Sequence, residues 1–309
     1  MDIDRIKGGF LGHLVADALG ASYEFKAPSS LPPIEQIEMV PPTGFRKTYE
    51  SVPIGTFTDD GSQALVLLET LLECEGFNPA DSGSRLVRWA SGYLWVDGHV
   101  FDVGGATRAA ISKLRSGTPP LEAGGVGENS NGNGSLMRVL PVALWHQGSD
   151  ADLVRLARDQ SRVTHGHLRS QVTCALYCLW ARALLEEVAD AWSAAVVRTR
   201  TVLHGEDAAT HELESEVLPD ISPSSYGRGY VVSSLHSARK AMEAGPYEAV
   251  VKAAVAMGYD TNTTACIAGG LAGIRDGFKA IPERWLEALR GRDIWEPILD
   301  RLLQQEDQR

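Results

Sequence analysis

The segment Thr58–Asp60 stands directly before an amphipathic stretch and combines a hydroxyl group with two adjacent carboxylates. One interpretation is helix capping, because a threonine at the N-cap and aspartates in the first turn satisfy backbone N–H groups and complement the helix dipole. The other is binding of a hard cation, because carboxylate and hydroxyl oxygens are the ligands that Mg²⁺ and Mn²⁺ prefer. The segment by itself fits both interpretations.

A second polar segment, Asp260–Thr263, repeats this pattern far along the chain and leads into ACIAGGLAG. Small residues at Ala265, Gly269, Ala272 and Gly273 would form one face of a helix and allow a close neighbour. Glycine in a helix costs about 1 kcal/mol relative to alanine, so several glycines in one helix indicate a packing requirement. Close approach would bring the two acidic helix starts together.

The segment Asn131–Ser135, in NSNGNGSLMRVLPVAL, is rich in asparagine and glycine and precedes an apolar stretch. This pattern is typical of a loop followed by a helix cap. It is also typical of backbone N–H groups that bind a phosphate at a helix start. Because it is neither a Walker A sequence nor GxGxxG, the pattern alone does not choose between the two.

Three isolated side chains are further candidates for functional residues. Glu24 follows a helical stretch, where a lone carboxylate is usually solvated, and Asp102, in FDVGGATRAAI, is placed to cap the helix that follows. His165, in VTHGH, comes at the end of a helical stretch, where a histidine complements the C-terminal dipole. His165 and His167 could share a metal ion, but the sequence offers no third ligand at zinc spacing, which argues against zinc.

The elements that must position these residues are helices. Apolar residues recur at intervals of three and four over residues 64–72, 153–163, 172–188 and 231–242, whereas alternation typical of strands does not persist. We therefore expect an all-α fold. The proline-rich residues 28–53 and the Gly-, Pro- and Asn-rich residues 117–134 cannot be regular helix throughout, and long loops of this kind are usually functional or mobile.

Composition and charge narrow the class of protein. The 309 residues include 29 Lys and Arg against 40 Asp and Glu, and a net charge of −11 argues against stable binding of nucleic acid. Four scattered cysteines form no disulfide framework, which favours buried thiols and a reducing cytoplasm. The sequence begins with acidic residues and has no run of 18 apolar residues, so we expect no membrane association.

We expect a single domain over residues 1–303, followed by a C-terminal tail over residues 304–309. No heptad seam predicts a dimer, so a monomer is expected.

Seven segments, taken in chain order, resemble the successive motifs of the ADP-ribosylglycohydrolase family. They are GHLVADALGASYEF, TFTDDGSQALVL, DVGGATRAAI, NGNGSLMRVLPVAL, THGH, GYVVSSLHSA and GYDTNTTACIAGGLAG. The resemblance runs from about residue 11 to residue 273, and its most specific part is the order of the TDD and GxDT(D/N)T motifs. The resemblance implies an all-α fold, a compact orthogonal multi-helix bundle around a dinuclear Mg²⁺ or Mn²⁺ site. It also implies an enzyme that hydrolyses the bond between ADP-ribose and an acceptor.

The resemblance also implies roles for the residues at matching positions. The metal ligands would be Thr58, Asp59, Asp60, Asp260, Asn262 and Thr263. Glu24 matches a mobile glutamate near the metals and Asp102 an acidic residue beside the scissile bond, and both, with Asp60, would serve catalysis. ADP-ribose would be held by Asn131, Gly132, Asn133, Gly134, Ser135, His165 and, as an aromatic lining residue, Tyr230.

These residue types suit the cleavage of a glycosidic bond, which passes through an oxocarbenium-like state. Two cations about 3.5–4 Å apart can bind ribose hydroxyls and a water molecule and lower the pKa of that water. Asp102 or Glu24 would then act as acid or base.

Asn262 departs from the family pattern, which has aspartate at this position. An amide offers a carbonyl oxygen without a charge, so one metal ion should bind more weakly. We expect a metal-dependent hydrolase that acts on an ADP-ribosylated protein, with ADP-ribosyl-arginine as the leading substrate. Serine-linked, nucleic-acid-linked and O-acetyl-ADP-ribose substrates stay open. The alternative is a catalytically degenerate protein of the same fold that binds ADP-ribose, neutralises a toxin or has a structural role.

Overall fold

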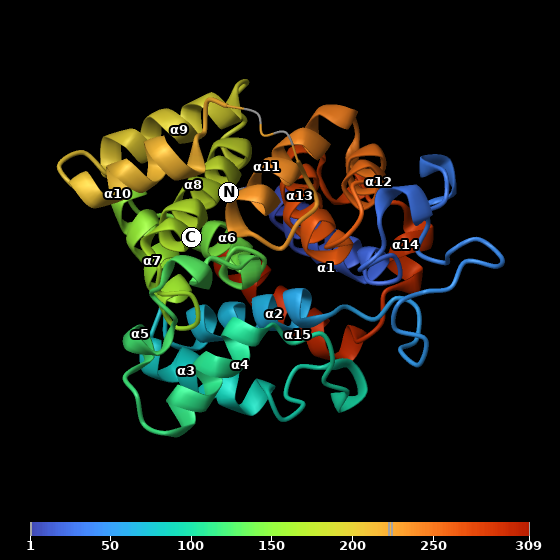
Figure 1. The fold of residues 1–309 in the computed structure, drawn as a ribbon, viewed down its shortest axis with the longest axis horizontal. Helices are drawn as coiled ribbons and strands as arrows, with labels where there is room; N and C mark the ends of the chain where they lie inside the picture. The colour runs from blue at the N-terminus through green and yellow to red at the C-terminus, as the bar shows by residue number, and fades with distance from the viewer. Residues whose placement is uncertain (1, 222, 224, 309) are drawn as a thin grey trace. The chain divides into compact units, whose positions relative to one another are not determined.

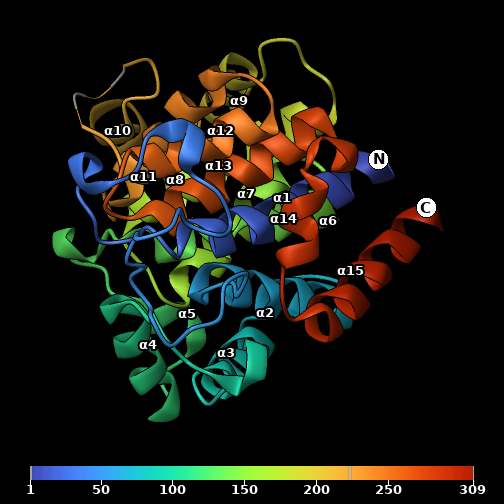
Figure 2. The same cartoon turned by 90° about the vertical axis from the view of Figure 1, so that its right-hand side faces the viewer.

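The computed structural model describes residues 2–221, 223 and 225–308. Over these residues the chain is nearly all helical and has no strand (Figures 1 and 2). The β pairing in this part of the chain consists of two isolated bridges, Gly125 with His165 and Gly132 with Tyr230. The expected all-α fold is therefore confirmed.

The α-helices are α1 (Ile3–Gly20), α2 (Asp59–Glu73), α3 (Pro79–Trp89), α4 (Gly105–Arg115), α5 (Pro120–Ala123), α6 (Leu140–Trp145), α7 (Asp150–Arg162), α8 (Leu168–Leu185), α9 (Ala191–Val202), α10 (Asp207–His211), α11 (Val231–Ala241), α12 (Tyr247–Ala256), α13 (Thr261–Asp276), α14 (Glu283–Ala288) and α15 (Arg292–Asp307). A π-helical turn, Glu212–Val217, follows α10. Between α1 and α2 the chain forms only two 3₁₀ turns, Pro28–Ser30 and Ile34–Gln36, as its proline content predicts.

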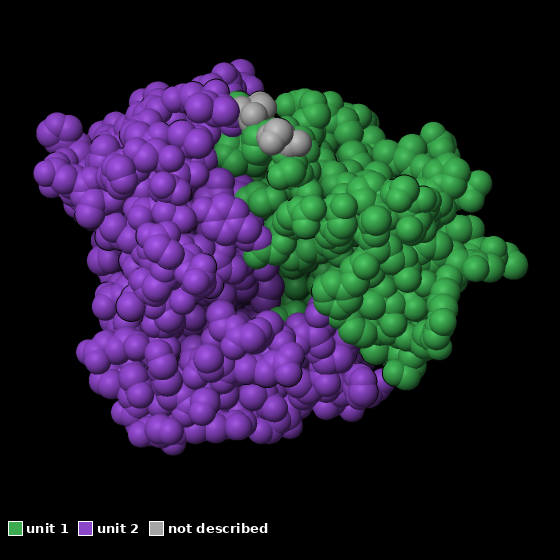
Figure 3. All heavy atoms as spheres, in the orientation of Figure 1, with its two compact units in different colours: residues 1–62, 223–229, 233–309 green, residues 63–222, 230–232 purple. Residues whose placement is uncertain are grey.

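The chain divides into two compact units (Figure 3). Unit 1 consists of residues 1–62, 223–229 and 233–309, and unit 2 of residues 63–222 and 230–232. The single domain over residues 1–303 stays a prediction. Residues 304–307 of the expected tail are the last turn of α15, in which Glu306 is buried.

In unit 1, α1 and α13 pack side by side (Figures 1 and 2). A Cβ atom placed on Gly8 would lie 2.3 Å from the carbonyl oxygen of Gly273, and one placed on Gly269 would lie 2.5 Å from the Cβ of Ala16. Real side chains do not fit at such distances. The small-residue face expected on α13 therefore does allow a close neighbour, and that neighbour is α1.

In unit 2, α8 is buried along almost its whole length, and α7 and α9 pack against it. Cys174 and Cys178 lie inside this helix as buried free thiols. Burial raises the pKa of Cys174 to about 11, so this thiol is protonated at neutral pH. The expectation of core thiols is thus confirmed for this pair.

The length and apolar character of the helices bear on the expectation of no membrane association. None of the helices in the described part of the chain combines the length and the apolar character needed to cross a bilayer. The cytoplasmic location and the monomeric state stay predictions.

Candidate functional site

The first acidic segment forms the N-terminus of α2, and Asp17 of α1 holds it in place. Asp17 Oδ2 accepts hydrogen bonds of 2.8 Å from the backbone N–H groups of Thr58 and Gly61, and Asp17 Oδ1 lies 2.8 Å from Thr58 Oγ1. Thr58 Oγ1 in turn accepts a hydrogen bond of 3.2 Å from the backbone N–H of Asp60. The capping interpretation of Thr58 is therefore confirmed, and Asp59 and Asp60 are buried in the first turn.

Asn262 joins the second polar segment to the first. Its Nδ2 atom lies 3.2 Å from Thr58 Oγ1 and donates to Asp60 Oδ2 at 3.3 Å. The end of α1 positions this residue, because a Cβ atom on Gly20 would lie 2.6 Å from Asn262 Cα, and Thr261 Oγ1 donates to the Gly20 carbonyl at 2.8 Å. The two acidic helix starts therefore lie together, as expected, and α1 is the element that joins them.

The rest of the second segment also presents oxygen atoms. Thr263 is buried in the first turn of α13. Asp260 is the N-cap residue by position, but its side chain makes no capping hydrogen bond. Its backbone N–H donates to the Gly227 carbonyl at 3.0 Å, and its Oδ2 atom faces Gly229, where a Cβ atom would lie 3.1 Å away.

We call the six side chains at these two helix starts the oxygen cluster: Thr58, Asp59, Asp60, Asp260, Asn262 and Thr263. Hydroxyl, carboxylate and amide oxygens are hard donors, so their chemistry fits Mg²⁺ or Mn²⁺ better than it fits zinc. Asn262 could offer such an ion only its Oδ1 atom, because Nδ2 is a donor.

Two neutral groups lie next to Asp60. Burial lowers the pKa of His13 to about 4, so its imidazole is uncharged at neutral pH. Burial, followed by the charges of Asp60 and Asp17, raises the pKa of Cys266 well above its usual value. The thiol is therefore protonated and donates to Asp60 Oδ1, at 3.1 Å. Neither His13 nor Cys266 supplies a positive charge to balance the carboxylates.

Glu24 is buried in unit 1, so the interpretation of a solvated lone carboxylate is wrong. The Tyr49 hydroxyl donates to Glu24 Oε2 at 2.8 Å. The next residue, Phe25, has a positive φ of 58°, and its backbone N–H donates to the Tyr259 carbonyl at 2.5 Å. This bond ties the backbone beside Glu24 to the residue before Asp260.

The segments expected to hold ADP-ribose come together in unit 2. Gly132 forms an antiparallel bridge with Tyr230, whose side chain is 39% exposed. The ring of His165 lies against Gly134, where a Cβ atom would lie 2.7 Å from its Cε1 atom. Three segments that are distant in the sequence are therefore neighbours.

Within the segment 131–135, the two end residues act as anchors. Asn131 Oδ1 accepts from Ser170 Oγ at 3.0 Å, and Asn131 Nδ2 donates to the Glu128 carbonyl at 3.0 Å. Ser135 is fully buried and accepts from Ser161 Oγ at 2.9 Å. Residues 132–134 between the anchors are partly exposed.

Arg138 is a buried cation beside this segment that the sequence analysis missed. Its Nη1 atom donates to the Gly134 carbonyl at 3.1 Å, and its Nε atom donates to Gln160 Oε1 at 3.0 Å. Burial, followed by the charge of Arg138, lowers the pKa of His165 to about 3. His165 is therefore neutral at pH 7 and can form hydrogen bonds with a ligand but no ion pair.

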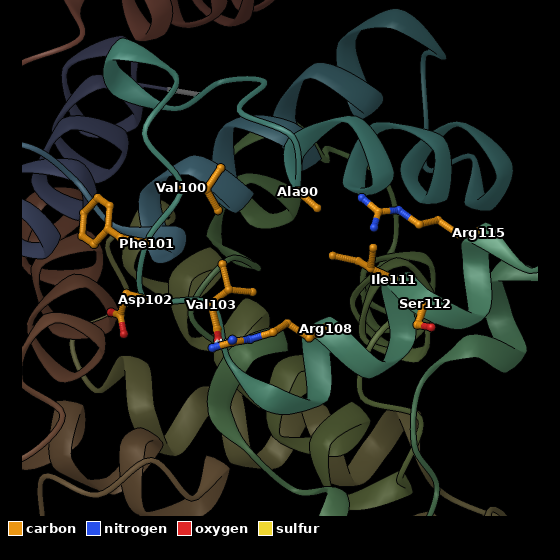
Figure 4. A pocket seen from close by; sticks show the side chains of 9 residues that line it. All are labelled: Ala90, Val100, Phe101, Asp102, Val103, Arg108, Ile111, Ser112 and Arg115. Carbon is orange, nitrogen blue, oxygen red and sulfur yellow. Dashed lines mark hydrogen bonds between the residues drawn. The ribbon is translucent and has the colours of Figure 1, made fainter.

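Asp102 precedes α4 with a positive φ of 56°. The N-cap of α4 is Gly104, so the interpretation of Asp102 as a cap is wrong. A left-handed conformation at a residue other than glycine is uncommon and is often found at functional sites. The Asp102 side chain lines a cavity of about 460 Å³ in unit 2 (Figure 4).

Glu128, His167 and Glu212 form an additional cluster in unit 2, with potential ligand atoms within 4.8 Å of one another. By spacing they could hold a metal ion. The Arg169 guanidinium, however, contacts both carboxylates, at 3.2 Å from Glu128 and 2.8 Å from Glu212. His167 Nδ1 accepts from the Arg169 backbone N–H, which places the hydrogen of the neutral ring on Nε2. These contacts favour an ion-pair network over a metal site.

The chain is similar to known proteins over its full length. Residues 1–309 match the ADP-ribosylglycohydrolase family. An ADP-ribosylarginine hydrolase, Tri1, of Pseudomonas putida is 30% identical over 98% of this chain and 78% of its own. A glycohydrolase of ADP-ribosyl dinitrogen reductase from Rhodospirillum rubrum is 28% identical over 93% of this chain and 90% of its own.

One solved structure, an ADP-ribosylglycohydrolase-related protein complex, superposes with a TM-score of 0.77. It is 33% identical to this chain and covers 98% of both chains. The match to this structure over nearly the whole length agrees with the helical architecture. The chain therefore belongs to the ADP-ribosylglycohydrolase family, a family of ADP-ribosyl hydrolases.

Proposed function

We propose that this protein is a metal-dependent hydrolase that releases ADP-ribose from ADP-ribosyl-arginine in a modified protein. The observation that carries the proposal is the meeting of two distant helix starts in one set of oxygen donors, of which all but Asp260 are buried; the contacts of Asn262 with Thr58 and Asp60 mark this meeting. The arginine linkage is supported by the similarity to Tri1, an ADP-ribosylarginine hydrolase that is 30% identical over nearly the whole chain.

The oxygen cluster would hold two Mg²⁺ or Mn²⁺ ions. When bound, such ions polarise substrate oxygens and lower the pKa of a water molecule. The protein itself fixes the ligands before any ion arrives: Asp17 holds the first turn of α2 by its hydrogen bonds to Thr58 and Gly61. Because Asp17 is fully buried, it acts on the cluster as a positioning residue.

Glu24 and Asp102 are the proposed acid and base. The Tyr49 hydroxyl fixes Glu24 Oε2 and so orients the carboxylate, whose other oxygen, Oε1, would accept or donate the proton. Asp102, in its strained loop, would act beside the scissile bond. Both residues are carboxylates of the kind that glycosidic cleavage requires.

The ADP-ribose group would be held by unit 2. Main-chain N–H groups of residues 132–134 suit the pyrophosphate, and the buried charge of Arg138 is close enough to this segment to favour an anion. Neutral His165 would add a hydrogen bond. Tyr230, which is partly exposed, would offer an aromatic face for stacking.

One observation favours a second candidate, an ADP-ribose-binding protein without turnover. Asn262 Nδ2 donates to Asp60 Oδ2, at 3.3 Å, so the amide satisfies a carboxylate that a cation would otherwise neutralise. The aspartate that the family has at this position cannot make that contact, because two carboxylates repel each other without a cation between them.

The deciding experiment measures release of ADP-ribose from an arginine-ADP-ribosylated protein, with and without millimolar Mg²⁺ or Mn²⁺. It compares the natural chain with Asn262→Asp. We expect metal-dependent release by the natural chain and about tenfold tighter metal binding after the substitution, because a charge is added to the ligand set. Asn78→Asp, which adds the same charge at the N-cap of α3, should change neither quantity.

The outcomes separate the two candidates. Release only from Asn262→Asp would establish the second candidate, a scaffold disabled at one ligand. No release from either protein, with unchanged metal binding, would contradict both the arginine linkage and the place of Asn262 in the ligand set.

A further inference from the structure

The cavity beside Asp102 lies wholly in unit 2, between Ala90, which follows α3, helix α4 and the loop of residues 100–103 (Figure 4). Its walls are mostly apolar, from Val100, Phe101, Val103 and Ile111, and Arg108 and Arg115 of α4 add guanidinium groups to its lining. In Figure 4 these side chains surround an open centre. Its volume of about 460 Å³ lies in the range of ligand-binding pockets.

Phe101, in the wall of this cavity, is the lining member of a row of four rings. Trp89 and Trp95 are stacked at 5.1 Å, Phe101 lies 5.4 Å from Trp95, and His99 stacks on Phe101 at 5.8 Å. Trp95 Nε1 also donates to the Trp89 carbonyl, at 3.0 Å. Because the loop is held to the end of α3 in this way, a ligand meets a rigid surface.

The charge around the cavity is opposite to that of the whole chain. The charged residues of its lining are Arg108, Arg115 and Asp102, which leaves one positive charge in excess in a protein of net charge −11. Arg115 is exposed, and it has no ion-pair partner in the described part of the chain. Val100 is 37% exposed in the same lining. Arginine next to exposed apolar and aromatic side chains is typical of the centre of a protein interface.

We propose that this cavity binds an acidic side chain and its apolar neighbour on the ADP-ribosylated protein, close to the modified arginine. This inference rests on the proposed function, because Asp102 in the same loop is the residue assigned to the scissile bond. The apolar walls accept the neighbour, and Arg115 pairs with the carboxylate. We favour a protein segment over a small anion as the ligand. The lining has apolar side chains, of which Val100 is exposed, and these would make no favourable contact with a phosphate alone.

The test uses two labelled peptides, each with one ADP-ribosyl-arginine, flanked by Glu-Leu in one and by Lys-Leu in the other. At 150 mM salt, where long-range steering is screened, we expect the natural chain to prefer the Glu-Leu peptide about tenfold in kcat/KM. Arg115→Glu should abolish or reverse this preference. Lys113→Glu is the matched control, because Lys113 is exposed in the same helical turn but does not line the cavity.

Free ADP-ribosyl-arginine is the second substrate, and its kcat/KM should be the same in all three proteins. An equal loss of peptide preference in Lys113→Glu would overturn the inference, because the effect would then be one of general charge. A loss on free ADP-ribosyl-arginine in Arg115→Glu would also overturn it, because the cavity would then bind the nucleotide.

A binding measurement separates this inference from the proposed function. Fluorescence anisotropy of the two peptides in EDTA reports binding without turnover. If the natural chain hydrolyses neither peptide but binds the Glu-Leu peptide better through Arg115, the proposed function fails and the docking inference stands. If it hydrolyses both peptides at equal rates and binds them equally, the inference fails and the proposed function stands.

Discussion

The oxygen cluster of unit 1 and the segment 131–135 of unit 2 expose different parts of the chain to a ligand. In the oxygen cluster the side chains carry the chemistry, and they are linked to one another, as Asn262 is to Thr58 and Asp60. In the segment 131–135 the end side chains are anchors and the residues between them are partly exposed, so we expect their main chain to contact the ligand. Metal binding should therefore depend on single charges, whereas binding of ADP-ribose should depend on backbone geometry.

The two regions also obtain their rigidity differently. The oxygen cluster depends on close helix packing, because α1 carries Asp17 and also presses against the start of α13 at Gly20. The segment 131–135 depends on polar contacts from the start of α8, where Ser170 holds Asn131 and Arg169 holds Glu128. Close helix packing tolerates little change in side-chain volume, and an arginine ion-pair network tolerates little change in the geometry of its donors.

The largest effect is expected from removal of one carboxylate of the oxygen cluster. Asp59→Ala should abolish the rise in melting temperature that Mg²⁺ or Mn²⁺ produces and should lower ADP-ribose release by about a thousandfold, because a ligand charge is lost. Differential scanning fluorimetry and the release assay measure the two quantities.

Asp293→Ala provides the control, since Asp293 is an exposed carboxylate in the first turn of α15. It should leave both quantities unchanged. An undiminished Mg²⁺ shift in Asp59→Ala would show that Asp59 is not a metal ligand.

The next largest effect tests the dependence of the oxygen cluster on helix packing. A Cβ atom on Gly273 would lie 2.1 Å from the Gly8 carbonyl oxygen, so Gly273→Ala must push α13 away from α1. We expect the free energy of unfolding to fall by about 3 kcal/mol, and metal affinity to fall with it. Urea denaturation and metal titration measure the two.

Gly104→Ala is the matched change in unit 2, because nothing lies within 4 Å of a Cβ atom there and φ is −63°. Because Gly104 is the N-cap of α4, where alanine is less favourable than glycine, we expect a loss of only about 0.5 kcal/mol. If the two substitutions destabilised the protein equally, the close approach of α1 and α13 would not be what holds the oxygen cluster.

The sequence predicted the fold class and the segments that meet because both depend on local patterns. Apolar spacing is enough to indicate helices, and the order of polar motifs is enough to indicate the family. The small-residue face of α13 correctly predicted a close neighbour. The sequence did not indicate that this neighbour is α1, because tight packing needs small residues on both helices and the partner face, Gly8 to Gly20, was not recognised.

The residues that position the site were missed for a physical reason. Asp17 and Arg138 contact groups that are distant in the sequence or belong to the main chain. Such contacts produce no pattern of residue spacing. A signal was present, because each is a lone charge in an apolar stretch, LVADALG and LMRVLPVAL, and a buried charge requires partners. The histidine pair was considered together, but His165 lies against Gly134 whereas His167 faces Glu128.

The smallest effect concerns the polar contacts that support Tyr230. Arg169 Nη1 donates to the Tyr230 hydroxyl at 3.2 Å, and its other nitrogens lie 2.8 Å from Glu212 and 3.0 Å from Glu216. Arg169→Lys keeps the charge but cannot make these contacts together. We expect KM for ADP-ribosyl-arginine to rise about fivefold with kcat unchanged, because Tyr230 is proposed to bind the ADP-ribose group and not the reacting atoms.

Arg158→Lys is the comparison, since Arg158 in unit 2 makes a partly exposed ion pair with Glu206 at 2.8 Å, and such pairs contribute little. It should change neither KM nor kcat. A stability loss in Arg169→Lys without any change of KM would mean that the network only holds the fold, and Tyr230 would then lose its place among the ADP-ribose contacts. A parallel fall in kcat would instead show that the contacts of Tyr230 and the segment 131–135 control the chemistry as well as binding, and the distinction between the two regions would fail.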